Sequence, residues 1–339
     1  MNLKEQVPFF LYCLKKRNDS RFIKSVYRLG DKSSCVDLEK GGDEPTDKVV
    51  YHIAQGATHS GFFADYNRML DLLYFADYYG MIPVVEYDKE CSYAEEHPVN
   101  GTRNPFEYYF AQPGGISLEE AMKYSVRLCS RKENTALAGT WNNGGSYYRL
   151  SEEYIVQLGR MTEKYISLNE YTKKKIFGDI ENLLGQKKCI GVHVRGTDFK
   201  QNYNRHPVRV SPQEYLEKTK HLLEKGNYDF VFLATDDTEA LTLFKKSLGN
   251  KVCFYEDVIR SDGNETVMKS EVKRKNHRYL LGLEVLRDMY TLAACDGLVA
   301  GFSQVSYAAR IQKSAQRERY FDIVIIDKGE NSNKRYCPT

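Results

Sequence analysis

The sequence lacks the features that mark membrane-spanning and secreted proteins. The 339 residues include one tryptophan and nine prolines. The longest apolar runs are only a few residues long, such as the one in Asp322-Ile-Val-Ile-Ile. Roughly 20 apolar residues are needed to cross a bilayer. The N-terminal stretch is interrupted by charge and by Pro8, and no small-residue cleavage site follows it. We therefore expect a soluble protein with no transmembrane segment and no signal peptide.

Neither sign of charge predominates. Lys plus Arg total 49 and Asp plus Glu total 46, which gives a formal charge of +3. This balance excludes a dedicated nucleic-acid or anionic-membrane binder. Any binding of an anionic ligand must depend on a local cluster of basic residues.

The eight cysteines form no Cys-x-x-Cys pair, and no His-Glu-x-x-His motif occurs, so a zinc site is not expected. Cys189, Cys253 and Cys295 lie in or beside apolar, strand-like runs. We interpret them as reduced core thiols, which favours a cytoplasmic location.

The length predicts about two domains, and no period of 20–50 residues repeats. In the second half, apolar runs of strand length alternate with amphipathic stretches. The runs are 188–195, 229–235, 251–256, 297–301 and 322–327, and the amphipathic stretches are 212–226, 238–248, 278–295 and 304–315. This alternation predicts an α/β protein with a doubly wound parallel sheet.

The first half has a shorter version of the same pattern. It predicts a strand at 48–53, a loop from Gly56 to Gly61, a helix at 62–80 and a strand at 82–86. A polar, turn-rich section follows at 91–145, and then helices near 151–168 and 170–184. We predict two Rossmann-like domains, 1–175 and 176–339, that face each other across a cleft.

The most specific motif ends the predicted strand at 188–195. It reads His193-Val-Arg195-Gly196-Thr197-Asp198. Alternation along a strand puts His193 and Arg195 on one face, where a guanidinium can bind a diphosphate in a bidentate manner. Gly196 permits close approach of the backbone, Thr197 can hydrogen-bond, and Asp198 can orient the arginine. The alternative is a core strand that ends in an Arg-Asp ion pair.

Two further strand ends carry polar residues. Thr235-Asp236-Asp237 can hold ribose hydroxyls or a metal, and it is equally suited to start a helix as an N-cap. Ser303-Gln304 begins a helix after a strand, so its backbone amides and hydroxyl suit an anion. A simple N-cap by Ser303 is the alternative, and the two roles are compatible.

Together these motifs resemble the α1,6-fucosyltransferases of glycosyltransferase family 23. Four motifs keep the family's order and spacing over roughly residues 188–312. They are the strand end from His193 to Asp198, the strand end from Ala234 to Asp237, Asn276-His-Arg-Tyr followed by Leu286-Arg-Asp288, and Phe302-Ser-Gln-Val. That family includes the rhizobial nodulation and animal core fucosyltransferases and is related to the peptide O-fucosyltransferases. The segment from Gly56 to Glu86 resembles the family's glycine-rich loop, helix and strand more weakly.

The resemblance implies a GT-B-like fold and an inverting, metal-independent transferase that moves fucose from GDP-fucose to a glycan, including a lipid-linked one. Residues 1–175 would form the acceptor side and 176–339 the donor-binding domain. No metal and no cofactor besides the donor are implied.

Roles are carried over by position. Arg195 would hold the β-phosphate and stabilise the charge that develops on the leaving GDP. His193 and Asp288 would contact the guanine nucleotide, and Ser303 would reach the diphosphate. The remaining donor-binding candidates are Thr197, Asp198, Thr235, Asp236, Asp237, Gln304 and, from the other domain, Gly61.

The sequence departs from the family at several positions. Gly196 replaces the second basic residue, Phe199 replaces a lysine, and Phe302-Ser-Gln replaces a two-serine version. The family's glutamate base has no match in 199–205. Candidates for a base are Asp65, Glu86 and Asp88, each with a surface charge as the alternative, and candidates for binding phosphate are Lys200, Arg205 and His206.

Two alternative functions remain. One is a transferase that uses another GDP-activated or UDP-activated sugar. The other is a catalytically silent nucleotide-sugar or glycan-binding protein of the same fold, which the missing basic residue and the missing glutamate favour. No Gly-x4-Gly-Lys-Ser/Thr motif is present, so a P-loop enzyme is not expected.

Overall fold

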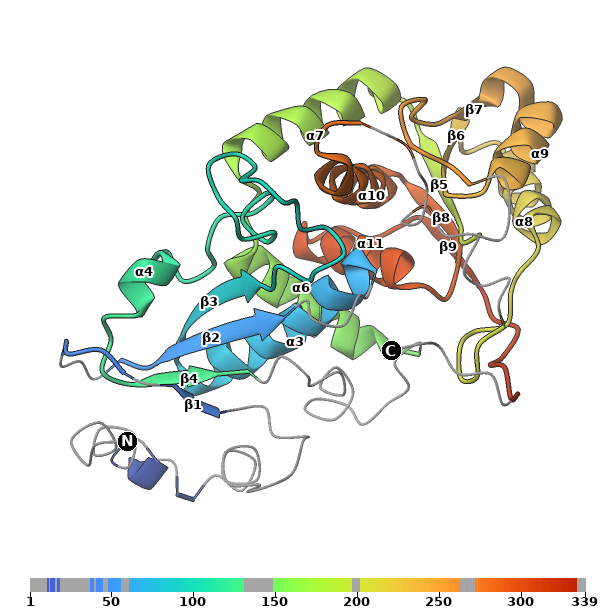
Figure 1. Ribbon diagram of the computed structural model, residues 1–339. Helices are drawn as coiled ribbons and strands as arrows, with labels where there is room; N and C mark the ends of the chain where they lie inside the picture. Colours follow the sequence, from blue (N-terminus) through green and yellow to red (C-terminus); the bar gives the residue numbers. More distant parts are fainter. Residues whose placement is uncertain are drawn as a thin grey trace. The chain divides into compact units, whose positions relative to one another are not determined.

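The chain divides into two compact units. The N-terminal unit comprises Met1–Tyr147 and Met161–Asn169, and the C-terminal unit comprises Tyr148–Arg160 and Glu170–Thr339. The computed structural model describes residues 11, 13–15, 17–18, 37–39, 41–44, 48–55, 61–130, 149–196, 202–261, 267, 272 and 274–333. Each unit contains a sheet flanked by helices (Figure 1), so the predicted α/β class is confirmed. The boundary after residue 175 and the facing cleft stay predictions.

The sheet of the C-terminal unit is entirely parallel, in the order β7-β6-β5-β8-β9. Its strands are β5 (Cys189–Val194), β6 (Phe230–Thr235), β7 (Val252–Cys253), β8 (Gly297–Gly301) and β9 (Asp322–Ile326). The first strand of this sheet in the sequence, β5, is central. The next two strands, β6 and β7, lie on one side of it, and the last two, β8 and β9, lie on the other side. The direction of winding therefore reverses between β5 and β8.

Helices cover this sheet, as the sequence pattern predicts. The elements are α6 (Glu152–Tyr165, of which residues to Arg160 belong to this unit), α7 (Glu170–Leu184), α8 (Pro212–Glu224), α9 (Thr238–Leu248), the short 3-10 helix η2 (Gly249–Lys251), α10 (His277–Ala294) and α11 (Gln304–Ala315). Helix α8 packs against α9, and α10 packs against α11 and α7. Every residue of β5 and β6 is buried, as parallel strands covered on both faces require.

The core between the sheet and α8 and α9 is made of branched apolar side chains and an aromatic ring. Val192, Val231 and Leu233 from the strands pack with Leu216 of α8 and Phe244 of α9. Fully burying one such side chain contributes about 1.5–3 kcal/mol relative to leaving it exposed. This core holds β5 and β6 in the sheet and so sets the positions of their carboxyl ends.

The N-terminal unit has a smaller sheet, in the order β1-β4-β2-β3. Its strands are β1 (Asp37–Glu39), β2 (Val50–Gln55), β3 (Ile82–Tyr87) and β4 (Arg127–Cys129), and its helices are α3 (Phe62–Tyr79) and α4 (Leu118–Ala121). Strands β2, β3 and β4 are parallel, whereas β1 is antiparallel to β4. Helix α3 ends at Gly80, whose φ of 66° is the left-handed conformation that favours glycine.

The described part of the predicted turn-rich section, 91–130, consists mostly of turns and loops, as expected, but several of its side chains are buried. It contains α4 and β4, each too short to give a periodic signal in the sequence. Tyr108 and Tyr109 are core residues with at most 1% of their surface exposed. The rings of Phe62 and Phe110 pack against Tyr109.

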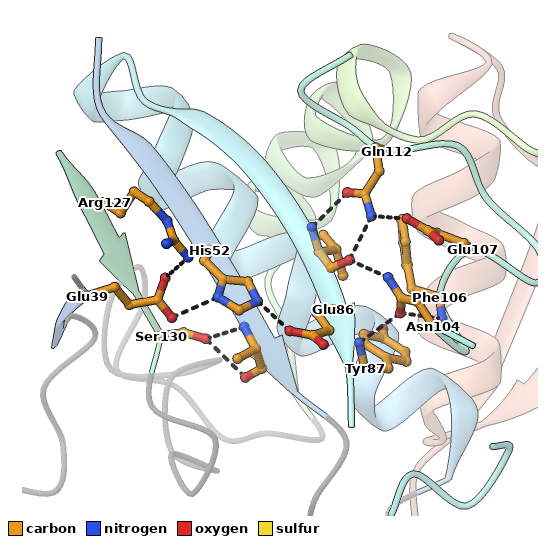
Figure 2. A network of polar contacts seen from close by, with 12 residues as sticks. Glu39, His52, Glu86, Tyr87, Asn104, Phe106, Glu107, Gln112, Arg127 and Ser130 are labelled. Carbon is orange, nitrogen blue, oxygen red and sulfur yellow. Dashed lines mark hydrogen bonds and ion pairs between the residues drawn. The ribbon is translucent and has the colours of Figure 1, made fainter. Parts of the chain in front are cut away.

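The same section completes the edge of the sheet at β3 (Figure 2). The Gln112 Oε1 accepts a hydrogen bond from the Val85 amide at 2.8 Å, and the Asn104 Nδ2 donates to the Val85 carbonyl at 2.8 Å. Asn104 Oδ1 also accepts from the Tyr87 amide at 3.0 Å. These side chains pair backbone groups that an edge strand otherwise leaves open.

None of the helices formed by the described residues is long and apolar enough to cross a membrane.

Candidate functional site

Two of the predicted motifs meet where the winding of the C-terminal sheet reverses. Strand β5 ends at Val194 and is followed by Arg195, and the neighbouring strand β8 ends at Gly301 and is followed by Phe302 and Ser303. In a doubly wound sheet, the loops at this point leave toward opposite faces, so ligands bind between them. The geometry of the sheet therefore selects the same place as the sequence motifs.

His193 and Ser303 are joined by a hydrogen bond at this point. Nδ1 of His193 lies 3.1 Å from Oγ of Ser303, and both side chains are buried. Ser303 is also the N-cap of α11, because its Oγ accepts a hydrogen bond from the Ser306 amide at 3.1 Å while Ser306 Oγ accepts from the Ser303 amide. The N-cap alternative is thus observed, and the amino end of the twelve-residue helix α11 lies beside His193.

The motif after β5 is packed against the end of β6. The Gly196 amide donates a hydrogen bond to Asp236 Oδ1 at 3.0 Å, and Arg195 Nη1 lies 4.0 Å from Asp236 Oδ2. A Cβ atom added to Gly196 would lie 2.5 Å from the Cβ of Asp237. Position 196 therefore has no room for a side chain in this packing.

Thr235 and Asp237 have structural partners. The Thr235 hydroxyl donates to the Val194 carbonyl at 3.0 Å and accepts from the Asp237 amide at 3.1 Å. Asp237 is buried and caps α9, because its Oδ1 accepts from the Glu239 amide at 2.9 Å. The N-cap interpretation is observed here, while a role in donor binding stays a prediction for both residues.

Asp288 is a buried acid on α10. It is 9% exposed, and none of the hydrogen bonds and ion pairs among the described residues involves its carboxylate. Burial raises the pKa of Asp288 to about 7, although Arg287 and Arg260 act in the opposite direction. Arg287 is held by other acids, with Nη1 2.7 Å from Asp179 Oδ2 and Nη2 2.5 Å from Asp257 Oδ1. A buried carboxyl group with a perturbed pKa is characteristic of functional sites.

The other predicted residues are either placed in elements of their own unit or lie outside the described residues. Gln304 is the first residue of α11. Gly61 precedes α3 in the N-terminal unit and is exposed. Arg205 and His206 are tied through their backbone to Asn331, with the Arg205 amide donating to the Asn331 carbonyl at 2.9 Å. Outside the described residues lie Thr197, Asp198, Phe199, Lys200 and the 56–60 part of the glycine loop.

The three candidate bases differ in exposure, because Asp65 is buried whereas Glu86 and Asp88 are partly exposed. Asp65 is buried and forms an ion pair with Arg68 at 3.1 Å. Asp88 Oδ1 accepts from the Glu90 amide at 2.9 Å in a turn. The Glu86 side chain is 47% exposed, and its Oε2 lies 3.0 Å from His52 Nε2.

Glu86 ends a row of alternating charges that crosses all four strands of the N-terminal sheet (Figure 2). Arg127 of β4 contacts Glu39 of β1, Glu39 contacts His52 of β2 at 2.9 Å, and His52 contacts Glu86 of β3. Burial by itself lowers the pKa of His52, but the hydrogen bonds to Glu39 and Glu86 raise it to about 9. His52 is therefore a cation at neutral pH, and Glu86 is held by it.

One basic residue close to the motif, Arg209, was not among the sequence candidates. Its Nη2 lies 3.8 Å from Asp237 Oδ2. A signal for it exists in the sequence, because Arg209 comes two residues before the Ser211-Pro212 start of α8. The loop between a parallel strand and its following helix lies at the carboxyl edge of the sheet.

No group of three or more histidine, cysteine or acidic side chains among the described residues is placed to hold a metal ion.

Comparisons with known proteins give matches among solved structures. No protein-family model matches the chain, and no curated protein matches it. Among the solved structures, the α-1,6-fucosyltransferase NodZ soaked with GDP-fucose is 19% identical, with a TM-score of 0.46, and the match covers 77% of this chain and 92% of that one. NodZ from Bradyrhizobium, at 16% identity and a TM-score of 0.44, is covered to 91%, over 78% of this chain. POFUT1 in complex with GDP is 12% identical, with a TM-score of 0.48, and the match covers 83% of this chain and 99% of that one.

These solved structures are fucosyltransferases, the class that the sequence motifs resemble.

Proposed function

We propose that the protein is a fucosyltransferase that transfers fucose from GDP-fucose to a glycan acceptor by an inverting, metal-independent reaction. The observation that supports this most is the contact of His193 with Ser303 at the reversal of the sheet, with Arg195 next to it. Motifs that lie far apart in the sequence are brought to the one place where a doubly wound sheet binds nucleotides.

The residues at this place suit the departure of a nucleoside diphosphate. Breaking the bond between fucose and the β-phosphate leaves negative charge on GDP and positive charge on the sugar. Arg195 can pair with phosphate oxygens through two parallel N–H groups. The amino end of α11, at Ser303, adds the partial positive charge of its helix dipole. The two act where charge develops and require no further ion.

Asp288 supplies a means of selecting guanine. Guanine presents two N–H donors on its Watson–Crick edge, and an ionised carboxylate has only acceptors. A buried carboxylate with no partner among the described residues is costly by itself, and a ligand that donates two hydrogen bonds offsets that cost.

The acceptor would be a glycan, including a lipid-linked one, and the reaction would take place in the cytoplasm. An inverting transfer needs a base that removes the proton of the acceptor hydroxyl. We propose Glu86, whose side chain is 47% exposed, as this base, with the partly exposed Asp88 as the alternative.

Calorimetric titration with GDP and with GDP-fucose in the presence of EDTA tests the donor site directly. Binding of both supports the proposal, whereas binding of neither excludes it. Arg195→Ala should abolish transfer with folding intact, and normal transfer by that variant would show that the donor site is assigned wrongly. Lys225→Ala is a suitable control, because Lys225 forms a loose ion pair with Asp322, 3.8 Å away at the amino end of β9.

A catalytically silent nucleotide-sugar-binding protein is the second candidate. The observation that favours it is the lack of room for a basic side chain at Gly196. It predicts GDP binding without turnover to any acceptor or to water. Transfer from another nucleotide sugar is distinguished by comparing GDP with UDP in a thermal-shift titration, since Asp288 favours guanine.

A further inference from the structure

Two arginines share the pair of acids that follows β6. Arg195 Nη1 lies 4.0 Å from Asp236 Oδ2, and Arg209 Nη2 lies 3.8 Å from Asp237 Oδ2. Arg209 is also 3.9 Å from Glu239 Oε2 in the first turn of α9. Each arginine side chain is 30% exposed. Two guanidinium groups from different parts of the β5–α8 connection thus lie near the carboxyl end of β6, at the edge of the sheet formed by the carboxyl ends of its strands.

The guanidinium of Arg209 donates no hydrogen bond to the described residues. A guanidinium carries five N–H donors, and none of those on Arg209 hydrogen-bonds to a described residue. Its Nε is buried and has no hydrogen-bond partner among them. Burying this one N–H group without an acceptor is costly, and the exposed part of the guanidinium is open to a ligand that accepts hydrogen bonds.

Two other arginines, whose Nε atoms likewise have no hydrogen-bond partner among the described residues, are bound more closely by their acids. Arg287 Nη1 lies 2.7 Å from Asp179 Oδ2 in the same unit, and Arg68 Nη1 lies 3.1 Å from Asp65 Oδ1. At 3.8 Å, the separation of Arg209 from Asp237 exceeds that of an N–H···O hydrogen bond. Asp237 therefore attracts Arg209 to this edge without occupying its donors.

A second guanidinium at these strand ends would give a diphosphate more hydrogen-bond donors than Arg195 and the amino end of α11 supply. A diphosphate exposes oxygens on two phosphorus atoms, and one guanidinium pairs with about two oxygens. Position 196, next to Arg195, cannot supply a charge, because a Cβ there would lie 2.5 Å from the Cβ of Asp237. The same acid that excludes a side chain at position 196 holds Arg209.

We infer that Arg209 is a second anion-binding residue of this site and that, with Arg195, it binds the diphosphate of the nucleotide ligand. The inference rests on the proposed function for the identity of that ligand as a guanine nucleotide. The part of the inference that does not depend on the nucleotide is that two guanidinium groups near the carboxyl end of β6 bind one pyrophosphate group.

The test is calorimetric titration of the full chain with GDP, with GMP and with inorganic pyrophosphate, all in EDTA. The proteins are the wild type, Arg209→Gln, Arg209→Lys and the control Lys225→Ala, whose ion pair with Asp322 has the same 3.8 Å separation at the opposite edge of the sheet. Arg209→Gln should weaken GDP and pyrophosphate binding at least tenfold and GMP binding by a smaller factor. Arg209→Lys should recover part of the loss, because it keeps the charge but not the paired donors.

The outcomes separate the inference from the proposed function. If the wild type binds pyrophosphate but not GDP, the nucleotide assignment fails, and a tenfold loss of pyrophosphate binding in Arg209→Gln still supports the inference. If Arg209→Gln binds pyrophosphate and GDP as the wild type does, Arg209 is a counterion of Asp237 and the inference is wrong. A wild type that binds neither probe overturns both. Thermal unfolding of each variant shows whether a loss of binding reflects a loss of folding, and Arg209→Lys provides the answer if Arg209→Gln is unstable.

Discussion

His193 Nδ1 and Ser303 Oγ are hydrogen-bonded at 3.1 Å although 110 positions separate them in the sequence. The contact joins the end of strand β5 to the N-cap of α11, so that a strand and a helix from opposite sides of the winding reversal meet. One hydroxyl therefore caps a helix and holds a histidine at the place where the sheet is expected to bind its ligand.

Ser303→Ala should weaken both the fold and the ligand site. Loss of an N-cap costs about 1 kcal/mol, and His193 loses a hydrogen-bond partner in a buried position, which adds about 1 kcal/mol. We expect a fall of roughly 2 kcal/mol in the free energy of unfolding, measured by chemical denaturation, and a reduction in GDP affinity. Ser117→Ala removes the N-cap of α4, where Ser117 Oγ accepts from the Glu120 amide at 3.0 Å, and it should leave GDP affinity unchanged. Equal effects of both variants on GDP binding would contradict a site at Ser303.

Asp288→Asn should stabilise the unliganded protein and weaken guanine binding. The pKa of Asp288 is raised in the folded state to about 7, from 3.8, so folding favours the protonated form. The contribution of Asp288 to stability is fully present below about pH 4 and is lost as the pH rises through about 7. The asparagine variant lacks this loss and should be roughly 2–4 kcal/mol more stable than the wild type at pH 8.

GDP titrations provide the second readout for Asp288. Because the ionised carboxylate accepts the N–H groups of guanine, wild-type GDP affinity should increase from pH 6 to pH 8, and the increase should be absent in Asp288→Asn. Discrimination between GDP and UDP should also diminish. A variant that gains stability at pH 8 but keeps full preference for GDP would show that Asp288 does not contact the base.

Gly196→Ala tests the crowding at the end of β6. The added Cβ would lie 2.5 Å from the Asp237 Cβ and 2.8 Å from Asp236 Oδ1, so the acids or the motif must move. Such overpacking costs about 1–3 kcal/mol, and GDP affinity should fall because Arg195 and Arg209 are held by those acids. Gly178→Ala is the matched control, since a Cβ added at this position of α7 meets nothing within 4 Å. An alanine at 196 that changes neither property would mean that the edge is loosely packed.

His52→Gln should lower stability in a pH-dependent manner. The pKa of His52 is raised from 6.5 to about 9, so the stabilisation by its charge is fully present below about pH 6.5 and is lost as the pH rises through about 9. We expect a loss of roughly 2 kcal/mol at pH 6, reduced from the full shift because Glu86 is half-exposed and screened by solvent. The difference from wild type should shrink toward pH 10. Chemical denaturation across this range measures it, with the exposed His221→Gln as control; a constant difference would argue against a charged His52.

The sequence determined much of the C-terminal unit by itself. The strands at 188–195, 229–235 and 297–301 and the helices at 238–248 and 304–315 were predicted to within a residue or two, because buried parallel strands are continuous apolar runs and helices carry a 3.6-residue period. The short elements α4 and β4 gave no signal of that kind. Their positions depend on the partners β1, β2 and β3, which lie elsewhere in the chain.

The motifs showed which residue types could bind a diphosphate, but their assembly was decided by the tertiary structure. Alternation along a strand placed His193 and Arg195 at a strand end, whereas only the strand order β6-β5-β8 brought Asp236 and Ser303 to either side of them. The burial of Asp288, the absence of room at Gly196 and the position of Arg209 are likewise consequences of packing. Local propensity acts over a few residues. A site of this kind is instead made by strands such as β5 and β8, which pair although about a hundred residues separate them in the sequence. That pairing is fixed by the burial of the whole sheet.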